Sequence, residues 1–212
     1  MKIIVPIQPN SFNSFARLLQ KVGNRADLVE IWLDKINNLD DFLKKFKQFK
    51  QQKKSQISFL AVCKTPEEKG SFSGSEEKKI KILQSFLASG GDFVDLDIQR
   101  NKKGNIQQIA TSSLLLSFHD FEKSPNNLSL LFDKMSTFSP AIYKIAVTPS
   151  SQEDLHSFLK IAKKLSTKNK IIFTTMGPLG EKGRTLLSAF SWGDFFALDD
   201  SSKTANGQKI LK

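Results

Sequence analysis

The chain has 212 residues, of which 39% are hydrophobic, and its 32 basic and 21 acidic residues give a formal net charge of +11. This length allows one sizeable core and does not require a second one, so we expect a single domain over residues 1–212. The only cysteine, Cys63, excludes an internal disulfide and a cysteine-based metal site, which is typical of cytoplasmic proteins. No apolar run reaches the roughly 18 residues needed to cross a bilayer, so we expect no membrane partner.

Short apolar runs alternate with longer amphipathic segments from one end of the chain to the other. In chain order, the apolar runs predict strands at Lys2–Ile7, Leu28–Leu33, Ile57–Cys63, Phe93–Ile98, Leu114–Phe118, Ala141–Val147, Lys170–Thr174 and Phe195–Leu198. Between them, helical periodicity predicts helices at Ser11–Val22, Leu39–Gln52, Glu76–Ala88, Asn126–Phe138, Gln152–Leu165 and Gly183–Phe190. Eight strands in this alternation favour an α/β fold of the closed (β/α)8 barrel type over an open doubly wound sheet.

Two connections depart from the regular alternation. The segment between Ile98 and Leu114 is short and polar, so it holds at most a turn or two of helix. After the eighth strand, the segment Gln208–Lys212 has room for barely one turn. We therefore expect the final helix of the barrel to be short or missing.

The positive charge raises the question of a nucleic-acid partner. Only four of the basic residues are arginines, the residue type on which base and bidentate phosphate recognition usually depends. The densest basic run, from Lys44 to Lys54, also contains Phe42, Phe46 and Phe49 at helical spacing. This pattern favours an amphipathic helix with a solvated lysine face over a polyanion site, so we expect no nucleic-acid partner.

The sequence places His119 and Lys144 toward the carboxyl ends of two successive buried strands. In (β/α)8 barrels the reacting groups lie at the carboxyl ends of the strands. A lysine can form an imine with a ketone, and burial beside other cations lowers its pKa and frees its lone pair. A histidine beside it can transfer protons. Two structural alternatives stay open: a core lysine paired with a carboxylate, and a histidine that only holds a loop. The other histidine, His156, is expected on a helix surface.

Two further polar residues follow strands. Glu68 comes after a Thr-Pro turn and is either a surface carboxylate or an acidic partner that orients His119. Arg184 follows a loop with three glycines at a helix start, a place that attracts anions, and would clamp a carboxylate or phosphate.

Several segments together resemble the type I 3-dehydroquinate dehydratases of the shikimate pathway of aromatic amino-acid biosynthesis. The resemblance covers most of the chain, and it lies in Val29–Asp34, Lys64–Gly70, Ser117–Phe121, Tyr143–Val147, Met176–Arg184 and Thr204–Gln208. It implies a (β/α)8 lyase that needs no cofactor or metal and dehydrates 3-dehydroquinate to 3-dehydroshikimate. The resemblance also implies Lys144 as the imine lysine, His119 as the general acid/base and Glu68 as its carboxylate partner.

The same resemblance implies the residues that hold the substrate. Arg184 would bind the substrate carboxylate, while Glu30, Thr204 and Gln208 would contact hydroxyls or close a loop over the ring. The family usually has an arginine at the position of Trp32 and another at Lys64. Trp32 cannot donate a fork of hydrogen bonds and Lys64 keeps only the charge, so weaker substrate binding is expected, by about 1.5–3 kcal/mol for each lost charge-assisted contact.

Two other functions remain as alternatives to the dehydratase. One is another imine-forming lyase or aldolase with a different keto substrate, because the strand-two and strand-three positions are altered. The other is a degenerate barrel that serves as a binding module. A homodimer and a fused or adjacent shikimate dehydrogenase domain, which some members of the family have, are left open as partners.

Overall fold

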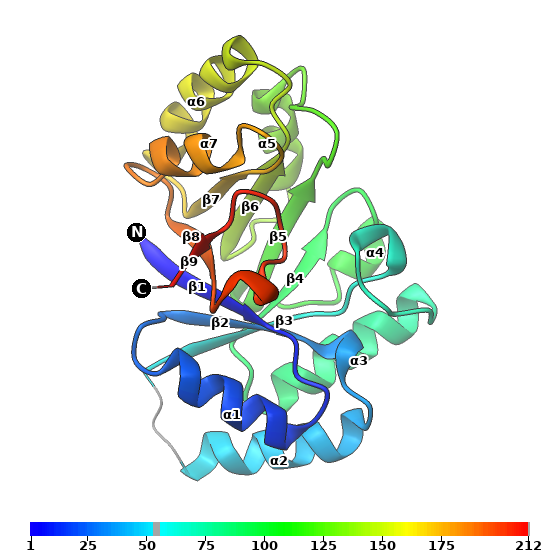
Figure 1. Cartoon of the computed structure of the whole chain (residues 1–212). Coiled ribbons are helices and arrows are strands. Elements are labelled where there is room, and N and C mark those ends of the chain that lie inside the picture. The colour runs from blue at the N-terminus through cyan, green and yellow to red at the C-terminus, as the bar shows by residue number, and fades with distance from the viewer. Residues whose placement is uncertain (53–55, 212) are drawn as a thin grey trace.

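Strands and helices alternate along nearly the whole chain, as the apolar periodicity predicts. The computed structural model describes residues 1–52 and 56–211 (Figure 1). The strands are β1 (Lys2–Ile7), β2 (Leu28–Trp32), β3 (Ser58–Val62), β4 (Phe93–Asp97), β5 (Leu114–His119), β6 (Ile142–Val147), β7 (Ile171–Thr175), β8 (Gly193–Ala197) and β9 (Lys209–Ile210). The helices are α1 (Phe12–Val22), α2 (Leu39–Gln52), α3 (Glu76–Ala88), α4 (Lys103–Ile106), α5 (Leu128–Ser136), α6 (Gln152–Ser166) and α7 (Gly180–Leu187).

The strands form one curled parallel sheet in the order β7-β6-β5-β4-β3-β2-β1-β8-β9. Curling brings β7 and β8 together, where Trp192 N donates to Ile171 O at 2.9 Å and Phe173 N donates to the Ser191 hydroxyl at 3.0 Å. Within the described residues no ladder of strand pairs crosses this seam, so side chains and single hydrogen bonds close the barrel there. The predicted α/β barrel class is confirmed.

An apolar layer fills the barrel on the amino-terminal side of the residues that line the cavity described below. Nearly every strand contributes one buried side chain to it: Ile4, Leu28, Leu60, Leu115, Ile142, Ile172 and Phe195. Alternate residues of a strand share a face, so the residues two positions further along also point into the barrel. In β6 that residue is Lys144, which therefore lies inside the barrel, directly above an apolar floor.

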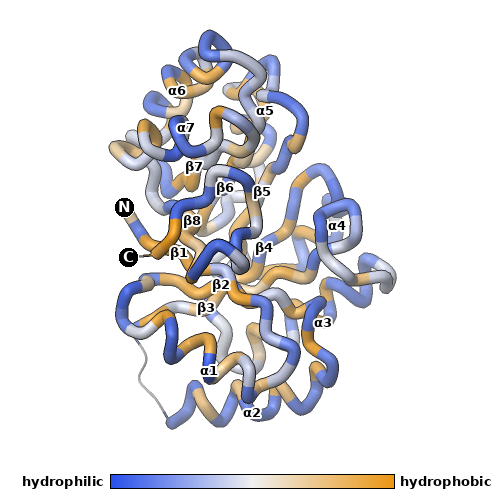
Figure 2. The backbone as a smooth tube through the Cα atoms, in the orientation of Figure 1, coloured by the Kyte–Doolittle hydropathy of each residue, from blue (hydrophilic) through white to orange (hydrophobic). Residues whose placement is uncertain are grey.

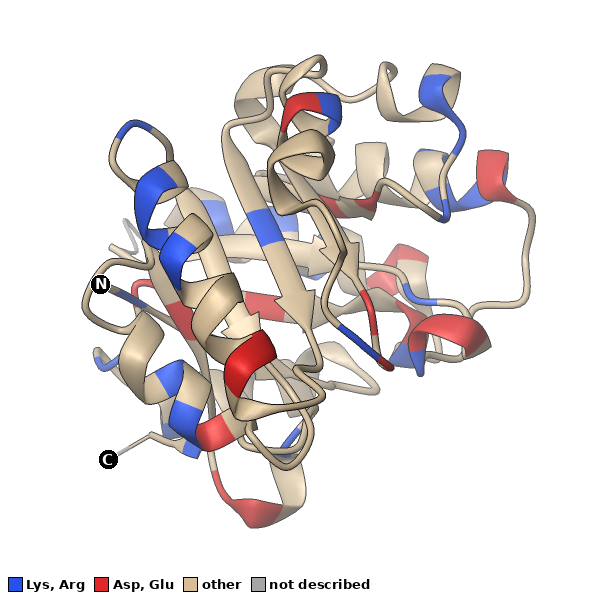
Figure 3. Ribbon diagram, turned by 90° about the horizontal axis from the view of Figure 1, so that it is seen from above, with Lys and Arg blue, Asp and Glu red and all other residues tan. Residues whose placement is uncertain are grey.

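The helices cover the outside of the sheet and bury a second, larger core (Figure 2). Between α1, α2 and β3 this core is built from phenylalanine rings, among them the fully buried Phe15, Phe42 and Phe46. In α2 the lysines Lys44 and Lys45 are exposed, as the amphipathic pattern predicts. Segments of the ribbon that are acidic and segments that are basic are both distributed over the molecule in Figure 3.

The end of the chain differs from the prediction. Residues 208–212 were expected to form barely one helical turn, but Lys209–Ile210 is a short strand that pairs in parallel with β8. Leu211 N donates to Ala197 O at 2.8 Å and the Leu211 side chain is buried, so this segment covers the edge of β8. Among the described residues no α-helix follows β8, and no helix is both long and apolar enough to span a membrane.

Candidate active site

A small cavity opens at the carboxyl ends of the strands, where the inward-facing residues above the apolar floor meet. Its volume is about 50 Å³, so the surrounding side chains are closely spaced. The lining residues are Glu30, Trp32, Lys64, Glu68, Lys69, His119, Phe121, Lys144, Ala146, Thr174, Met176, Arg184, Phe195, Thr204 and Ala205. All the residues predicted for the site except Gln208 thus line one cavity, although they come from six different strands or the loops that follow them.

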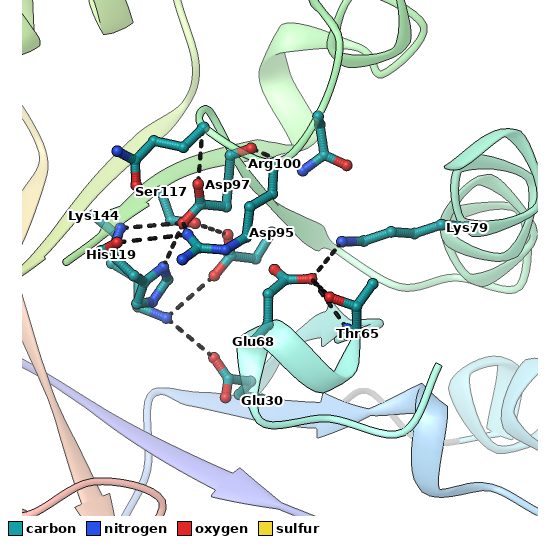
Figure 4. A network of polar contacts seen from close by, with 12 residues as sticks. Glu30, Thr65, Glu68, Lys79, Asp95, Asp97, Arg100, Ser117, His119 and Lys144 are labelled. Atoms are coloured by element: carbon teal, nitrogen blue, oxygen red, sulfur yellow. Dashed lines mark hydrogen bonds and ion pairs between the residues drawn. The ribbon is translucent and has the colours of Figure 1, made fainter. Parts of the chain in front are cut away.

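Lys144 is held between two carboxylates. Its Nζ lies 3.2 Å from Asp95 Oδ2 on β4 and 3.6 Å from Glu30 Oε2 on β2 (Figure 4), and 4.4 Å from the centre of the Phe195 ring. The Ser117 hydroxyl donates to the other oxygen of Asp95 and so fixes that carboxylate. Burial lowers the pKa of Lys144, but Asp95 and Glu30 outweigh burial and raise the pKa above its usual 10.5.

The pKa of Lys144 therefore corrects the prediction from sequence. Burial beside other cations was expected to lower it, whereas the nearest charged groups are the carboxylates of Asp95 and Glu30. The structural alternative, a core lysine paired with a carboxylate, describes the free protein. An imine role is compatible with that pairing, because the same carboxylates can take the proton of the amine and then face a positively charged imine.

His119 is oriented by Asp97, which is also on β4. The ring Nδ1 of His119 lies 2.9 Å from Asp97 Oδ2, and the backbone N of His119 donates to the same oxygen at 3.1 Å. Arg100 Nη1 donates to this oxygen at 3.0 Å (Figure 4). Because an ionised carboxylate only accepts, Nδ1 carries the hydrogen and Nε2 keeps a free lone pair. Burial, followed by the charges of Lys144 and Lys64, holds the pKa of His119 well below 6.5, so the ring is neutral at neutral pH.

Glu68 does not occupy the place that the sequence predicts for it. Its Oε2 accepts from Lys79 Nζ on α3 at 2.9 Å, and from the backbone N and hydroxyl of Thr65 at 3.1 and 3.2 Å. The prediction that Glu68 orients the His119 ring is wrong in this respect, because Asp97 is the carboxylate on Nδ1. Glu68 lines the cavity as part of a capped turn, Pro66–Glu68, that follows β3.

Trp32 points into the cavity, next to Glu30 and Lys64. Its indole Nε1 donates to Glu30 Oε1 at 2.9 Å, and Lys64 Nζ lies 4.4 Å from the centre of the indole ring. Glu30 Oε2 is buried and has no hydrogen-bond partner in the described part of the protein. Lys64 has no carboxylate within ion-pair distance among the described residues. Burial lowers its pKa, partly opposed by Glu30 and reinforced by Lys144.

Arg184 lies on α7 and is almost completely buried. Its Nε donates to Thr175 O at 3.1 Å and its Nη1 donates to Asp194 Oδ1 at 2.6 Å, so an internal carboxylate offsets its charge. On the loop before β9, Thr204 lines the cavity, and both its backbone N and its hydroxyl donate to Gln208 Oε1, at 2.7 and 3.2 Å. Gln208 is thus placed behind Thr204 and holds the loop that covers the cavity.

Asp95, Asp97 and Arg100 are site residues that the sequence analysis missed. The segment Phe93–Ile98 was identified as a strand, and the alternation of side chains within it puts both aspartates on the inner face. Two carboxylates on the inner face of a buried strand need cations or donors nearby, and this was the available signal. Arg100, only three residues after Asp97, gave no comparable signal.

Comparison with known proteins gives the family. A model of the type I 3-dehydroquinase family matches residues 3–211. The chain belongs to this family. A 3-dehydroquinate dehydratase of Streptococcus thermophilus is 29% identical over 221 residues, covering 100% of this chain and 94% of the relative. A 3-dehydroquinate dehydratase of Lactococcus lactis subsp. cremoris is 30% identical over 216 residues, covering 100% and 92%.

Solved structures agree with the type I 3-dehydroquinase fold. A type I 3-dehydroquinate dehydratase from Clostridium difficile, solved with covalently modified comenic acid, has a TM-score of 0.84 at 20% identity and covers 99% of this chain and 87% of its own. A 3-dehydroquinate dehydratase from Geobacillus kaustophilus has a TM-score of 0.84 at 22% identity, with 99% and 86% covered. The resemblance predicted from the sequence motifs is confirmed at the level of the family.

Proposed function

We propose that this protein dehydrates 3-dehydroquinate to 3-dehydroshikimate through an imine on Lys144. One observation carries the proposal: Lys144 and His119 come from the neighbouring strands β6 and β5 and line the same cavity. Membership of the type I 3-dehydroquinase family supports the reaction and the shikimate pathway as its setting. The substrate is a free small molecule, and we propose a cytoplasmic location for the reaction.

The first step is attack of Lys144 on the ring ketone. The ammonium must first lose a proton, and Asp95 Oδ2, at 3.2 Å, is the nearest acceptor. Asp95 then returns this proton to the hydroxyl of the resulting carbinolamine, which leaves as water and gives a protonated imine. This cation takes the place of the ammonium between Asp95 and Glu30, so the carboxylates that hinder the loss of the first proton stabilise the intermediate.

His119 performs both proton transfers of the dehydration. Its neutral Nε2 removes a proton from the carbon next to the imine, which is acidic because the protonated imine accepts the electron pair. The enamine then expels the β-hydroxyl, and the imidazolium returns the proton to it so that it leaves as water. Hydrolysis of the product imine frees 3-dehydroshikimate and Lys144. Asp97 keeps the ring in the correct tautomer and stabilises the imidazolium.

The remaining lining residues would hold the ring. Lys64 supplies a cation without a carboxylate of its own, and Glu30 Oε2 is a buried acceptor available to a substrate hydroxyl. We propose that Arg184 attracts the substrate carboxylate and that Thr204, held by Gln208, contacts the ring from the covering loop. Glu68 would act by keeping the turn after β3 in place.

Reductive trapping tests the proposal. The protein is incubated with 3-dehydroquinate and borohydride, and the adduct is mapped by mass spectrometry while the conjugated product is followed by its absorbance. We expect an adduct on Lys144 that is lost in Lys144→Ala, together with product formation. Absence of both the adduct and the product in the wild-type protein would remove the proposal.

Trp32 favours a second candidate, an imine-forming lyase for a different ketone. The indole occupies part of the cavity wall and already bonds Glu30 Oε1 at 2.9 Å, so it reduces the number of substrate hydroxyls that this wall can bind. The same trapping experiment with a panel of keto acids separates the two. A more efficient adduct with a keto acid that has fewer hydroxyls would favour the second candidate.

A further inference from the structure

Thr174 lies in the wall of the cavity, level with the proposed general base. In the parallel pairing of β5, β6 and β7, His119 is opposite Ala146 and Ala146 is opposite Thr174. Residues in register in a parallel sheet share a face, so the three side chains form one row. All three line the cavity. The alanine in the middle is small, which leaves space between the imidazole and the threonine hydroxyl.

The hydroxyl of Thr174 has no protein partner. The residue is only 3% exposed, and its Oγ1 is buried without a hydrogen-bond partner in the described part of the chain. The next residue, Thr175, shows the contrast: its hydroxyl is also buried but donates to Gly180 O at 2.9 Å. A buried hydroxyl without a partner is costly, so the partner of Thr174 has to come from the cavity.

We propose that Thr174 is a further substrate-binding residue, whose hydroxyl makes a hydrogen bond to a ring hydroxyl of the substrate. This rests on the proposed function, and it adds a contact from β7 to those from β2, β3 and the covering loop. Glu30 Oε2 is a second buried oxygen of the cavity wall without a hydrogen-bond partner among the described residues, although Lys144 Nζ lies 3.6 Å from it. Two such oxygens on separate strands fit a ring with several hydroxyls and do not fit an apolar ligand.

The competing explanation is that Thr174 only fills space with its methyl group. Threonine and valine have nearly the same shape, so Thr174→Val removes the hydroxyl and keeps the packing. If the hydroxyl has no protein partner, its removal leaves the melting temperature unchanged or raises it. If it binds substrate, the same change weakens binding. Stability and binding then move in different directions, which a space-filling role does not predict.

The test compares Thr174→Val with Thr174→Ser and with Thr175→Val as the matched control. For Thr174→Val we expect an unchanged or higher melting temperature and a kcat/KM for 3-dehydroquinate that is about two- to tenfold lower, mainly through KM, as for the loss of one neutral hydrogen bond. Thr174→Ser keeps a hydroxyl and should retain most of the affinity. Thr175→Val removes a satisfied hydroxyl, so its melting temperature should fall.

Two outcomes overturn the inference alone: an active wild-type protein with a Thr174→Val variant of unchanged KM, or a Thr174→Val variant that is destabilised as much as Thr175→Val. A wild-type protein that forms neither the Lys144 adduct nor the product overturns the proposed function, and this inference with it. The two failures are therefore distinguishable.

Discussion

Two lysines face the same cavity from different strands and have opposite surroundings. Lys144, in the middle of β6, lies within 3.2 and 3.6 Å of two carboxylates. Lys64, just after the end of β3, lies 4.4 Å from the indole ring of Trp32. It has no ion pair among the described residues. The pKa of Lys144 is raised and that of Lys64 is lowered, although burial acts on both in the same direction.

The difference separates two properties that an imine-forming lysine needs. Lys64 loses its proton more easily than Lys144, because its pKa is lowered while that of Lys144 is raised. Lys144 lies next to the carboxylates of Asp95 and Glu30, which would accept its proton and would then stabilise the protonated imine that we propose. Catalysis depends on the transition state and the intermediate rather than on the ground state, so we assign the imine to the lysine with the higher pKa.

Replacing each lysine in turn tests most directly which of the two forms the imine. We expect Lys144→Met to lower kcat by a factor on the order of 10³ or more and to abolish the trapped adduct, because the nucleophile is gone. Lys64→Met should raise KM about tenfold and leave the adduct on Lys144, because only a charge facing the substrate is lost. Circular dichroism checks that both variants fold. An adduct mapped to Lys64 in the wild-type protein would contradict the assignment.

The second prediction concerns the ion pair between Glu68, in the turn that follows β3 and Lys64, and Lys79 on α3. Glu68 and Lys79 have side chains that are 11% and 5% exposed, and their nearest atoms are 2.9 Å apart. Lys79→Met removes the cation next to the nearly buried carboxylate of Glu68, so we expect a loss of about 3 kcal/mol in the free energy of unfolding.

The matched control is the surface pair Lys45–Asp41, whose side chains are 47% and 45% exposed. Lys45→Met should cost less than about 0.5 kcal/mol because solvent screens that pair. Urea unfolding of the two variants gives both values. Equal small losses would mean that the Glu68–Lys79 pair does not stabilise the turn that follows Lys64.

Asp97 supports His119, which lies next to Lys144 on the neighbouring strand β5, and its removal should have a smaller effect on activity than the loss of Lys144. Asp97→Asn keeps the shape of the residue but removes the charge next to Nδ1 of His119, so we expect a 10- to 100-fold lower kcat/KM. The exposed Asp133→Asn on α5 is the control and should be unchanged. A loss of activity with an unaltered pH profile would show that Asp97 supports the fold and does not tune His119.

Much of the barrel could be predicted because its determinants are local. Apolar runs and helical periodicity located the eight main strands and the six longer helices. The strand-end rule located His119, and the alternation of side chains within the next strand indicated that Lys144 could point into the barrel. The strand Lys209–Ile210 could not be predicted, since two residues have no periodicity and their structure depends on pairing with β8.

The electrostatics of the site were the less predictable part. Burial lowers the pKa of Lys144, and it is raised overall because Asp95 and Glu30, which come from two other strands, outweigh burial. Their convergence depends on the order of strands in the closed sheet and on the stagger between them. Similarly, Glu68 was the only carboxylate predicted as a partner of His119. In the structure the packing of α3 brings Lys79 to Glu68, and Asp97 is the carboxylate on Nδ1 of His119.

The smallest expected effect is in the pH dependence, and it tests the neutral state of His119. Its pKa lies well below 6.5, so kcat/KM should change by less than about twofold between pH 6 and 7 and should decrease only at lower pH, as the free imidazole gains a proton. At pH values between the pKa of His119 in the folded protein and its pKa in the unfolded chain, the unfolded chain binds more protons than the folded one. Stability should therefore also decrease as the pH falls below about 6.5. Rate measurements and urea unfolding over pH 4–8 check both trends. A decrease in kcat/KM with a midpoint at 6.5 or above would contradict the lowered pKa of His119. It would mean that burial and the charges of Lys144 and Lys64 do not keep the proposed base neutral.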